Sequence, residues 1–128
     1  MVAFRPYGNS SRDIVPGPLY DPADVLNLLK NAQTINFWTS KCGQDVQKLA
    51  FDQEDVCELL RSAIVGGTFK NSEWCVQRPD GPWAACDAYC VNRLESIPTR
   101  HTEVSIEYYL KFAISLNGNA LLVAYCHS

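Results

Sequence analysis

The strongest constraint on the fold is the stretch "VSIEYYLKFAISL-NG-NALLVAYC", which spans residues 104–126. Its first half alternates apolar side chains with other side chains at a period of two, which indicates a half-buried strand. Asn117-Gly118 is a residue pair favoured in two-residue hairpin turns. A second apolar run follows that turn. The sequence therefore predicts that the chain ends in a β-hairpin.

The register of this hairpin follows from the position of its turn. If Asn117-Gly118 forms the turn, counting outward places Lys111 opposite Ala124 and Tyr109 opposite Cys126. Strand alternation then puts Tyr109 and Lys111 together on the face of the sheet that points away from the core.

Helices are expected before the sheet. In "YDPADVLNLLKNA", Asp21 is a good N-cap and an apolar stripe follows it, which predicts a helix over residues 22–32. "SKCGQDVQKLA" is a weaker helix with Ser40 as a possible cap. A third helix should begin after Asp52 and end at Gly66-Gly67.

Strand patterns replace helical ones after this glycine pair. Residues 72–77 and 83–91 flank "RPDGP", a turn-forming cluster. We therefore predict an α+β fold in which two to three N-terminal helices pack on a twisted antiparallel sheet that ends in the hairpin. Residues 1–19, rich in Pro, Gly and Ser, are expected to form an irregular arm, and residues 20–128 a single domain.

Composition is that of a folded domain. Hydrophobic residues make up 47 % of the 128 residues, and this length fits one domain. The net charge of −3 argues against a strongly basic nucleic-acid binder, and residues 1–60 hold the excess, with 8 acidic and 5 basic side chains. No apolar run reaches membrane-spanning length, and the first residues lack a signal core, so we expect a cytoplasmic protein that binds no membrane.

Cysteine is the one residue type that hints at a metal. In the cytosol six cysteines are thiols or ligands more often than disulfides. Cys86 and Cys90 have C-x3-C spacing, but structural zinc usually needs two such pairs, so we expect neither metal nor cofactor and keep a small zinc protein as an alternative. His101 and His127 belong to no recognisable motif, which argues against a thiol enzyme.

Lys70 lies where the third helix gives way to the sheet. It is one of two lysines after residue 48, and Lys111 is the other. A sheet face that carries two lysines and Tyr109 suits a phosphate, because the cations can hold its oxygens and the phenol can donate or accept a proton. Equally, a lysine at such a position is commonly a solvated strand residue.

Five segments in sequence order resemble the MqsR family of toxin–antitoxin mRNA interferases, which belong to the RelE-like fold group. The segments are "KLAFD" (48–52), "TFKNS" (68–72), "ACDAY" (85–89), "YYLKFAI" (108–114) and "VAYC" (123–126). The resemblance extends over residues 25–126. It implies a metal-independent endoribonuclease that cuts single-stranded mRNA at short sequence motifs. It also implies a cognate antitoxin, a DNA-binding helix-turn-helix protein, as its partner.

The family's catalytic set is a lysine, a glutamine, a tyrosine and a last-strand lysine. By position, Lys70 and Tyr109 match this set, whereas Cys86 and Cys126 occupy the glutamine and last-strand lysine positions. A thiol supplies no fixed positive charge, so we expect Lys111 to replace the missing cation in part.

The segments also suggest substrate-binding residues. These are Phe69, Asn71, Asp87 and Tyr89. Two interpretations stay open: an active ribonuclease toxin, or a diverged, inactive member that acts as a protein-binding module.

Overall fold

The computed structural model describes residues 12–97, 99 and 102–128, which form three α-helices and one six-stranded sheet. The helices are α1 (Pro22–Leu28), α2 (Ser40–Lys48) and α3 (Gln53–Gly66), with a short 3-10 helix at Ala32–Thr34. The strands are β1 (Asp13–Ile14), β2 (Ile35–Phe37), β3 (Thr68–Val76), β4 (Trp83–Ile97), β5 (Thr102–Ile114) and β6 (Leu121–His127). The α+β class predicted from the sequence is confirmed. In the part of the chain described, no helix is long and apolar enough to cross a bilayer.

The helix caps explain where the helices begin and end. Asp21 caps α1 as predicted, by accepting a hydrogen bond from the backbone N–H of Ala23. The helix ends at Leu28 rather than continuing to residue 32, because Asn31 caps the separate 3-10 turn that follows. The cap of α2 is Thr39 instead of Ser40, and its hydroxyl accepts from the backbone N–H of Cys42.

Helix α3 follows the prediction closely. Asp52 accepts from the backbone N–H of Asp55, and the Asp55 side chain accepts from that of Asp52, which together form a capping box. Its buried stripe is Val56, Cys57, Leu59, Leu60 and Ala63. This stripe packs on the sheet, so α3 is the main cover of the core.

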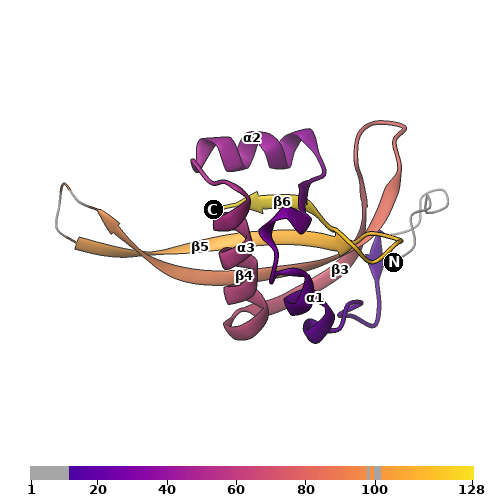
Figure 1. Ribbon diagram of the computed structural model, residues 1–128, viewed down its shortest axis with the longest axis horizontal. Coiled ribbons are helices and arrows are strands. Elements are labelled where there is room, and N and C mark those ends of the chain that lie inside the picture. Colours follow the sequence, from indigo (N-terminus) through magenta and orange to yellow (C-terminus); the bar gives the residue numbers. More distant parts are fainter. Residues whose placement is uncertain (1–11, 98, 100–101) are drawn as a thin grey trace.

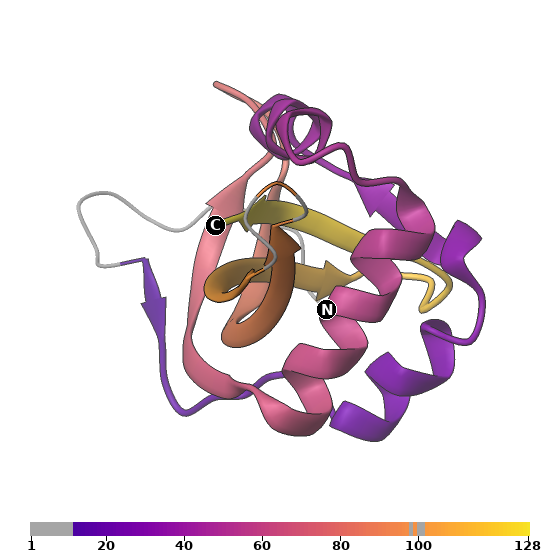
Figure 2. The ribbon, with the colours of Figure 1, turned by 90° about the vertical axis from the view of Figure 1, so that its left-hand side faces the viewer.

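The sheet has strand order β1-β3-β4-β5-β6-β2. It is mixed rather than antiparallel as predicted, because β2 pairs with β6 in parallel while every other pair is antiparallel. Helices α1 and α3 lie against one face, and α2 lies along the β6 side (Figure 1, Figure 2). None of the described helices covers the opposite face, which we call the open face.

The expected irregular arm needs a correction within its described residues. Asp13–Ile14 forms the edge strand β1, which pairs with Glu73 and Ser72 of β3. Farther along, the backbone N–H groups of Leu19 and Tyr20 donate to the carboxylate of Asp87. The segment is therefore fixed to the sheet at two points. The remainder of the expected arm, residues 1–11, lies outside the described residues.

The C-terminal hairpin has the predicted register only near its turn. Ile114 pairs with Leu121 and Phe112 with Val123, as the count from Asn117-Gly118 requires. The loop is longer than two residues, because Ser115 N–H bonds to the Ala120 carbonyl.

A β-bulge between Lys111 and Phe112 then shifts the pairing by one residue. Beyond it Lys111 pairs with Tyr125 instead of Ala124, and Tyr109 pairs with His127 instead of Cys126. This shift changes which side chains of β6 reach the open face.

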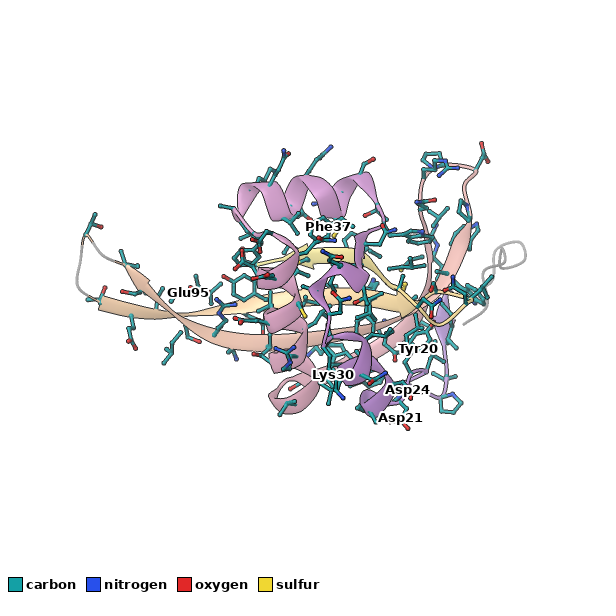
Figure 3. The ribbon with its side chains drawn as sticks, in the orientation of Figure 1. Tyr20, Asp21, Asp24, Lys30, Phe37 and Glu95 are labelled. Carbon is teal, nitrogen blue, oxygen red and sulfur yellow. The ribbon has the colours of Figure 1, made fainter. Side chains whose placement is uncertain are left out.

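Strands β4 and β5 extend past the helices as a two-stranded arm (Figure 1). Glu95 lies on this arm (Figure 3) and accepts a hydrogen bond from the Tyr108 hydroxyl at 2.9 Å. The arm also exposes apolar side chains, with Leu94 67 % and Val104 37 % accessible. It is thus the least covered part of the sheet.

Candidate functional site on the open face

The open face carries most of the chemically active side chains of the sheet. Register and strand alternation place seven residues on it, namely Asn71, Glu73, Cys90, Tyr109, Lys111, Tyr125 and His127. The core face carries the intervening residues, among them Tyr108, Leu110 and Phe112, which are 0–3 % exposed. The sheet therefore separates an apolar core from a face able to hold a polar ligand.

Tyr109 and His127 form the centre of this face. They are direct cross-strand partners, and their rings stack with centroids 5.3 Å apart and an interplanar angle of 27°. Both side chains are partly exposed. His127 Nδ1 lies 3.4 Å from the Ser128 carbonyl, so a proton on Nδ1 would leave Nε2 as an acceptor. A phenol and an imidazole thus lie side by side at the surface.

Lys111 lies beside this pair and is held by its surroundings. It is 5 % exposed and ion-paired with Glu73, and its Nζ lies 5.5 Å from the ring centroid of Tyr109 and 4.9 Å from that of Tyr125. Burial alone would lower the pKa of Lys111, but the hydrogen bond to Glu73 and nearby Cys75 and Tyr109 raise it overall. The ammonium therefore stays charged.

Lys70 is exposed at the irregularity of β3, between Phe69 and Asn71, where the pairing with β4 shifts. Its charge lowers the pKa of Cys90, although burial and Glu107 raise that pKa overall. Cys90 is the strand partner of Tyr109. Lys70 itself lies at the register shift of β3, two strands away from Tyr109, and Thr68 is the β3 residue opposite Cys90. A shared role of Lys70 and Tyr109 at one phosphate group stays a prediction.

Two buried thiols lie next to Lys111. Cys75 and Cys86 come from the neighbouring strands β3 and β4, and all six cysteines are free thiols. A hydrogen bond from the Cys86 thiol, aided by the charge of Lys111, lowers the pKa of Cys75. The same pairing with Cys75, together with burial, raises the pKa of Cys86. Cys86, in the position where the resemblance expects a glutamine, is 0 % exposed and does not reach the surface.

The four predicted substrate-binding residues divide between the two faces. Asp87 is fully buried and Tyr89 is 6 % exposed, stacked on Phe112 with centroids 6.0 Å apart. Phe69 packs edge-on against Tyr89 at 5.6 Å. These three residues belong to the core side, so the structure does not support the substrate contacts predicted for them. Asn71 is half-buried on the open face and remains a candidate.

The residue opposite Tyr109 was also predicted wrongly. Cys126 pairs with Leu110 on the core face and is 0 % exposed, and burial raises its pKa to about 12. His127 takes the predicted place of Cys126. The sequence interpretation missed His127 because the bulge leaves no mark in the alternation of β5. A weak sign of the bulge lies in β6, where the consecutive residues Val123 and Ala124 are both buried instead of alternating between the two faces.

In the described ranges, no three His, Cys, Asp or Glu side chains are grouped as metal ligands.

A scan against protein-family models matched none, and searches of curated proteins and of solved structures found no significant similarity. The resemblance to MqsR toxins therefore remains a hypothesis from the sequence.

Proposed function

We propose that this chain is a metal-independent endoribonuclease that cleaves single-stranded RNA on the open face. The observation that carries the proposal is the partly exposed Tyr109–His127 pair, stacked at 5.3 Å, with Lys111 beside Tyr109. RNA cleavage without a metal requires a base for the ribose 2′-hydroxyl, an acid for the leaving oxygen and a cation for the phosphorane. The three kinds of group occur together here.

The groups fit the reaction as follows. His127 Nε2 takes the proton from the 2′-hydroxyl, and the 2′-oxygen forms a bond to the adjacent phosphorus. The bond from phosphorus to the 5′-oxygen breaks, and Tyr109 donates its phenolic proton to that oxygen. The products are a 2′,3′-cyclic phosphate and a 5′-hydroxyl.

Positive charge supports the transition state. Lys70, being exposed, is the cation that contacts the phosphate oxygens. Lys111 is buried and paired with Glu73, so it acts by holding positive charge beneath the two tyrosine rings rather than by contact. This division of roles differs from the sequence hypothesis, in which Lys111 itself replaced the missing cation.

The test is cleavage of a single-stranded RNA oligonucleotide in the presence of a chelator. His127→Ala and Tyr109→Phe should each lower the cleavage rate by about a hundredfold or more, since general acid–base catalysis contributes roughly 10²–10⁴-fold. Mass spectrometry of the products should detect the cyclic phosphate. Wild-type rates after both substitutions would remove the basis of the proposal.

Two matched controls accompany these variants. Tyr108→Phe removes a hydroxyl from the adjacent residue, which faces the core side and donates a hydrogen bond to Glu95. His101→Ala removes the chain's other histidine. Both controls should cleave RNA at close to the wild-type rate.

In the cell such an enzyme would act as the toxin of a toxin–antitoxin pair, with a DNA-binding antitoxin as its partner. The acidic excess in residues 1–60 suits a basic partner surface. Induced expression should arrest growth with RNA cleavage, and the product of the adjacent gene should relieve it. Expression of the Tyr109→Phe variant should be harmless.

A second candidate function is a non-catalytic protein-binding module. It is favoured by the β4–β5 arm, which exposes Leu94 and Val104 to solvent. Harmless expression of the wild-type chain, together with no RNA cleavage in vitro, would favour this function over the ribonuclease.

A further inference from the structure

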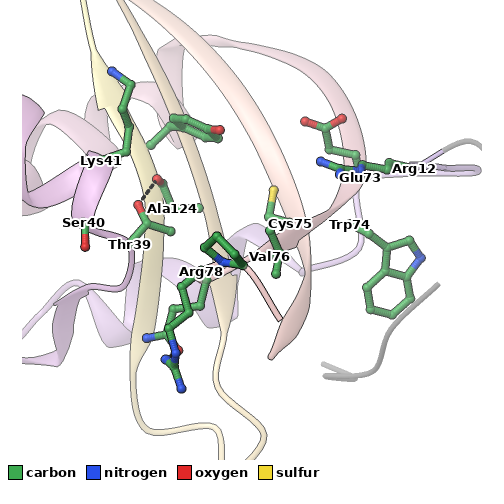
Figure 4. A pocket seen from close by; sticks show the side chains of 13 residues that line it. Arg12, Thr39, Ser40, Lys41, Glu73, Trp74, Cys75, Val76, Arg78 and Ala124 are labelled. Atoms are coloured by element: carbon green, nitrogen blue, oxygen red, sulfur yellow. Dashed lines mark hydrogen bonds between the residues drawn. The ribbon is translucent and has the colours of Figure 1, made fainter. Parts of the chain in front are cut away.

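A cavity of about 340 Å³ lies between the start of α2 and strands β3 and β6, with Tyr125 in its wall. Its walls come from Thr39–Lys41 at the start of α2, from residues 73–79 of β3 and the loop that follows, and from Ala124–Tyr125 of β6. Arg12, next to β1, completes the lining (Figure 4). Its size lies near the lower end of the range of about 300–1,000 Å³ typical of small-ligand sites.

The cavity is positively charged. Arg12, Lys41 and Arg78 line it from three different segments, and Glu73, the acidic lining residue, is ion-paired with Lys111. Lys41 is paired with Asp45. Within the described residues, Arg12 and Arg78 have no carboxylate at ion-pairing distance. Arg12 lies over the Trp83 ring at 4.9 Å and Arg78 donates one hydrogen bond to Gln77, so both guanidinium groups keep their charge and further N–H donors for an anionic ligand. Guanidinium groups suit phosphate in particular.

The cavity also offers an aromatic wall. Tyr125 lines it, and the ammonium of Lys111 lies over that ring at 4.9 Å from its centroid. An aromatic side chain at the edge of a basic groove is the usual platform for stacking a nucleobase. The charge and the wall together match a nucleotide better than a bare anion.

Polar side chains of the lining are largely committed to the protein itself. The Thr39 hydroxyl donates to the Ala124 carbonyl at 2.7 Å, and Gln77 Nε2 donates to the Trp38 carbonyl at 2.9 Å. The Gln77 side-chain oxygen accepts from Arg78. Few groups are therefore left to read the edge of a base, so binding should tolerate all four bases.

One residue, Tyr125, connects the cavity to the proposed catalytic pair. Tyr125 belongs to the cavity wall and also contacts His127 edge-on, with ring centroids 6.1 Å apart. We propose that this cavity is a nucleotide subsite, which holds the phosphate and the base of the residue next to the scissile phosphate. The inference rests on the proposed ribonuclease function for its place in the reaction, although binding can be measured separately.

Binding is tested with a single-stranded oligodeoxynucleotide, which lacks the 2′-hydroxyl and is not cleaved. Arg78→Glu reverses one exposed cavity charge, and the matched control Lys48→Glu reverses an exposed charge elsewhere on the protein, in the last turn of α2. We expect Arg78→Glu to weaken binding by about tenfold or more, since a charge-assisted contact is worth roughly 1.5–3 kcal/mol. Lys48→Glu should stay within about twofold of wild type.

Fluorescence anisotropy of a dye-labelled oligodeoxynucleotide provides the signal. Equal binding by wild type and Arg78→Glu would overturn the proposal, as would an equal loss in both charge-reversal variants. Melting temperatures of both variants check that they fold, and Arg12→Gln supplies a second cavity variant that should also weaken binding.

Two further measurements test the chemical class of the ligand. AMP, GMP, CMP and UMP should bind within about threefold of one another, as expected for stacking without base readout. Inorganic phosphate should compete much more weakly than any of them. A strong preference for one base, or competition by phosphate as effective as that by the nucleotides, would contradict the proposed subsite.

Failure of the subsite can be told apart from failure of the ribonuclease. If the oligodeoxynucleotide binds in an Arg78-dependent way but wild type cleaves no RNA, the subsite is supported and the ribonuclease function is refuted. If wild type cleaves RNA and Arg78→Glu leaves KM within about twofold of wild type, the ribonuclease function is supported and the subsite is refuted.

Discussion

Asp87 was predicted to bind substrate, but its buried position gives it a structural role that can be tested directly. Its side chain is fully buried and receives hydrogen bonds from three donors. Leu19 N–H donates at 3.0 Å to both oxygens, Tyr20 N–H at 3.1 Å, and the Ser72 hydroxyl at 2.6 Å. These bonds join the segment before α1 to strands β3 and β4.

The magnitude follows from what each substitution leaves unpaired. Asp87→Ala removes the acceptor of three donors, of which the Tyr20 N–H and the Ser72 hydroxyl are buried. Each buried donor without a partner costs about 1–3 kcal/mol, so we expect a loss of roughly 2–6 kcal/mol in unfolding free energy. Asp87→Asn keeps the shape. Its amide oxygen can accept from the two N–H groups while its amide nitrogen donates to the Ser72 hydroxyl, so we expect a loss of only about 1–2 kcal/mol.

Urea unfolding measures the unfolding free energy of both variants. An unchanged slope m shows that each variant exposes as much surface on unfolding as the wild type does. The result that refutes this reasoning is an Asp87→Ala variant within about 1 kcal/mol of wild type, or an Asp87→Asn variant as unstable as the alanine. RNA cleavage is measured alongside. A stable Asp87→Asn variant whose cleavage rate falls by orders of magnitude would restore the substrate role.

Three further predictions concern thiols and backbone. Burial raises the pKa of Cys42 and of Cys126 to about 12 from an ordinary 9.0. Above pH 9 these thiols ionise in the unfolded state but not in the folded state, so the melting temperature should fall as the pH rises from 9 towards 12. A Cys42→Ala/Cys126→Ala variant should show a flatter dependence of melting temperature on pH. Iodoacetamide at pH 8 should modify the half-buried Cys90 before these two thiols, as read by peptide mass spectrometry, and an equal rate for all three would contradict the assigned burial. Ala50 has a φ of 58° just after α2, so Ala50→Gly should stabilise the protein by about 0.5–1 kcal/mol in urea unfolding, and a destabilised variant would count against that conformation.

Local patterns predicted the elements well because their causes are local. The N-caps Asp21 and Asp52 bond to backbone groups two or three residues ahead, so the sequence alone identifies them. The alternation of residues 104–114 identified β5 and placed Tyr109 and Lys111 on the open face, because strand side chains alternate whatever their partner strand is. Lys70 was singled out from its place after the Gly66-Gly67 helix end, and its role stays a prediction.

The packing and cross-strand partners of each residue depend on contacts between segments that are distant in the sequence. The bulge at Lys111/Phe112 brings His127 rather than Cys126 beside Tyr109, and no local pattern in β5 marks it. Asp87 looks like an exposed strand residue until Leu19 and Tyr20, which are 68 and 67 residues earlier in the chain, are placed against it.

The sequence by itself thus determined the helices, the main strands and the face on which Tyr109 and Lys111 lie. The tertiary structure alone decided that an imidazole joins the phenol, that Lys111 is buried against Glu73, and that Arg12, Lys41 and Arg78 meet around one cavity. The physical reason is that periodicity and capping depend on near neighbours, whereas register, burial and charge clustering depend on which strands and helices come together.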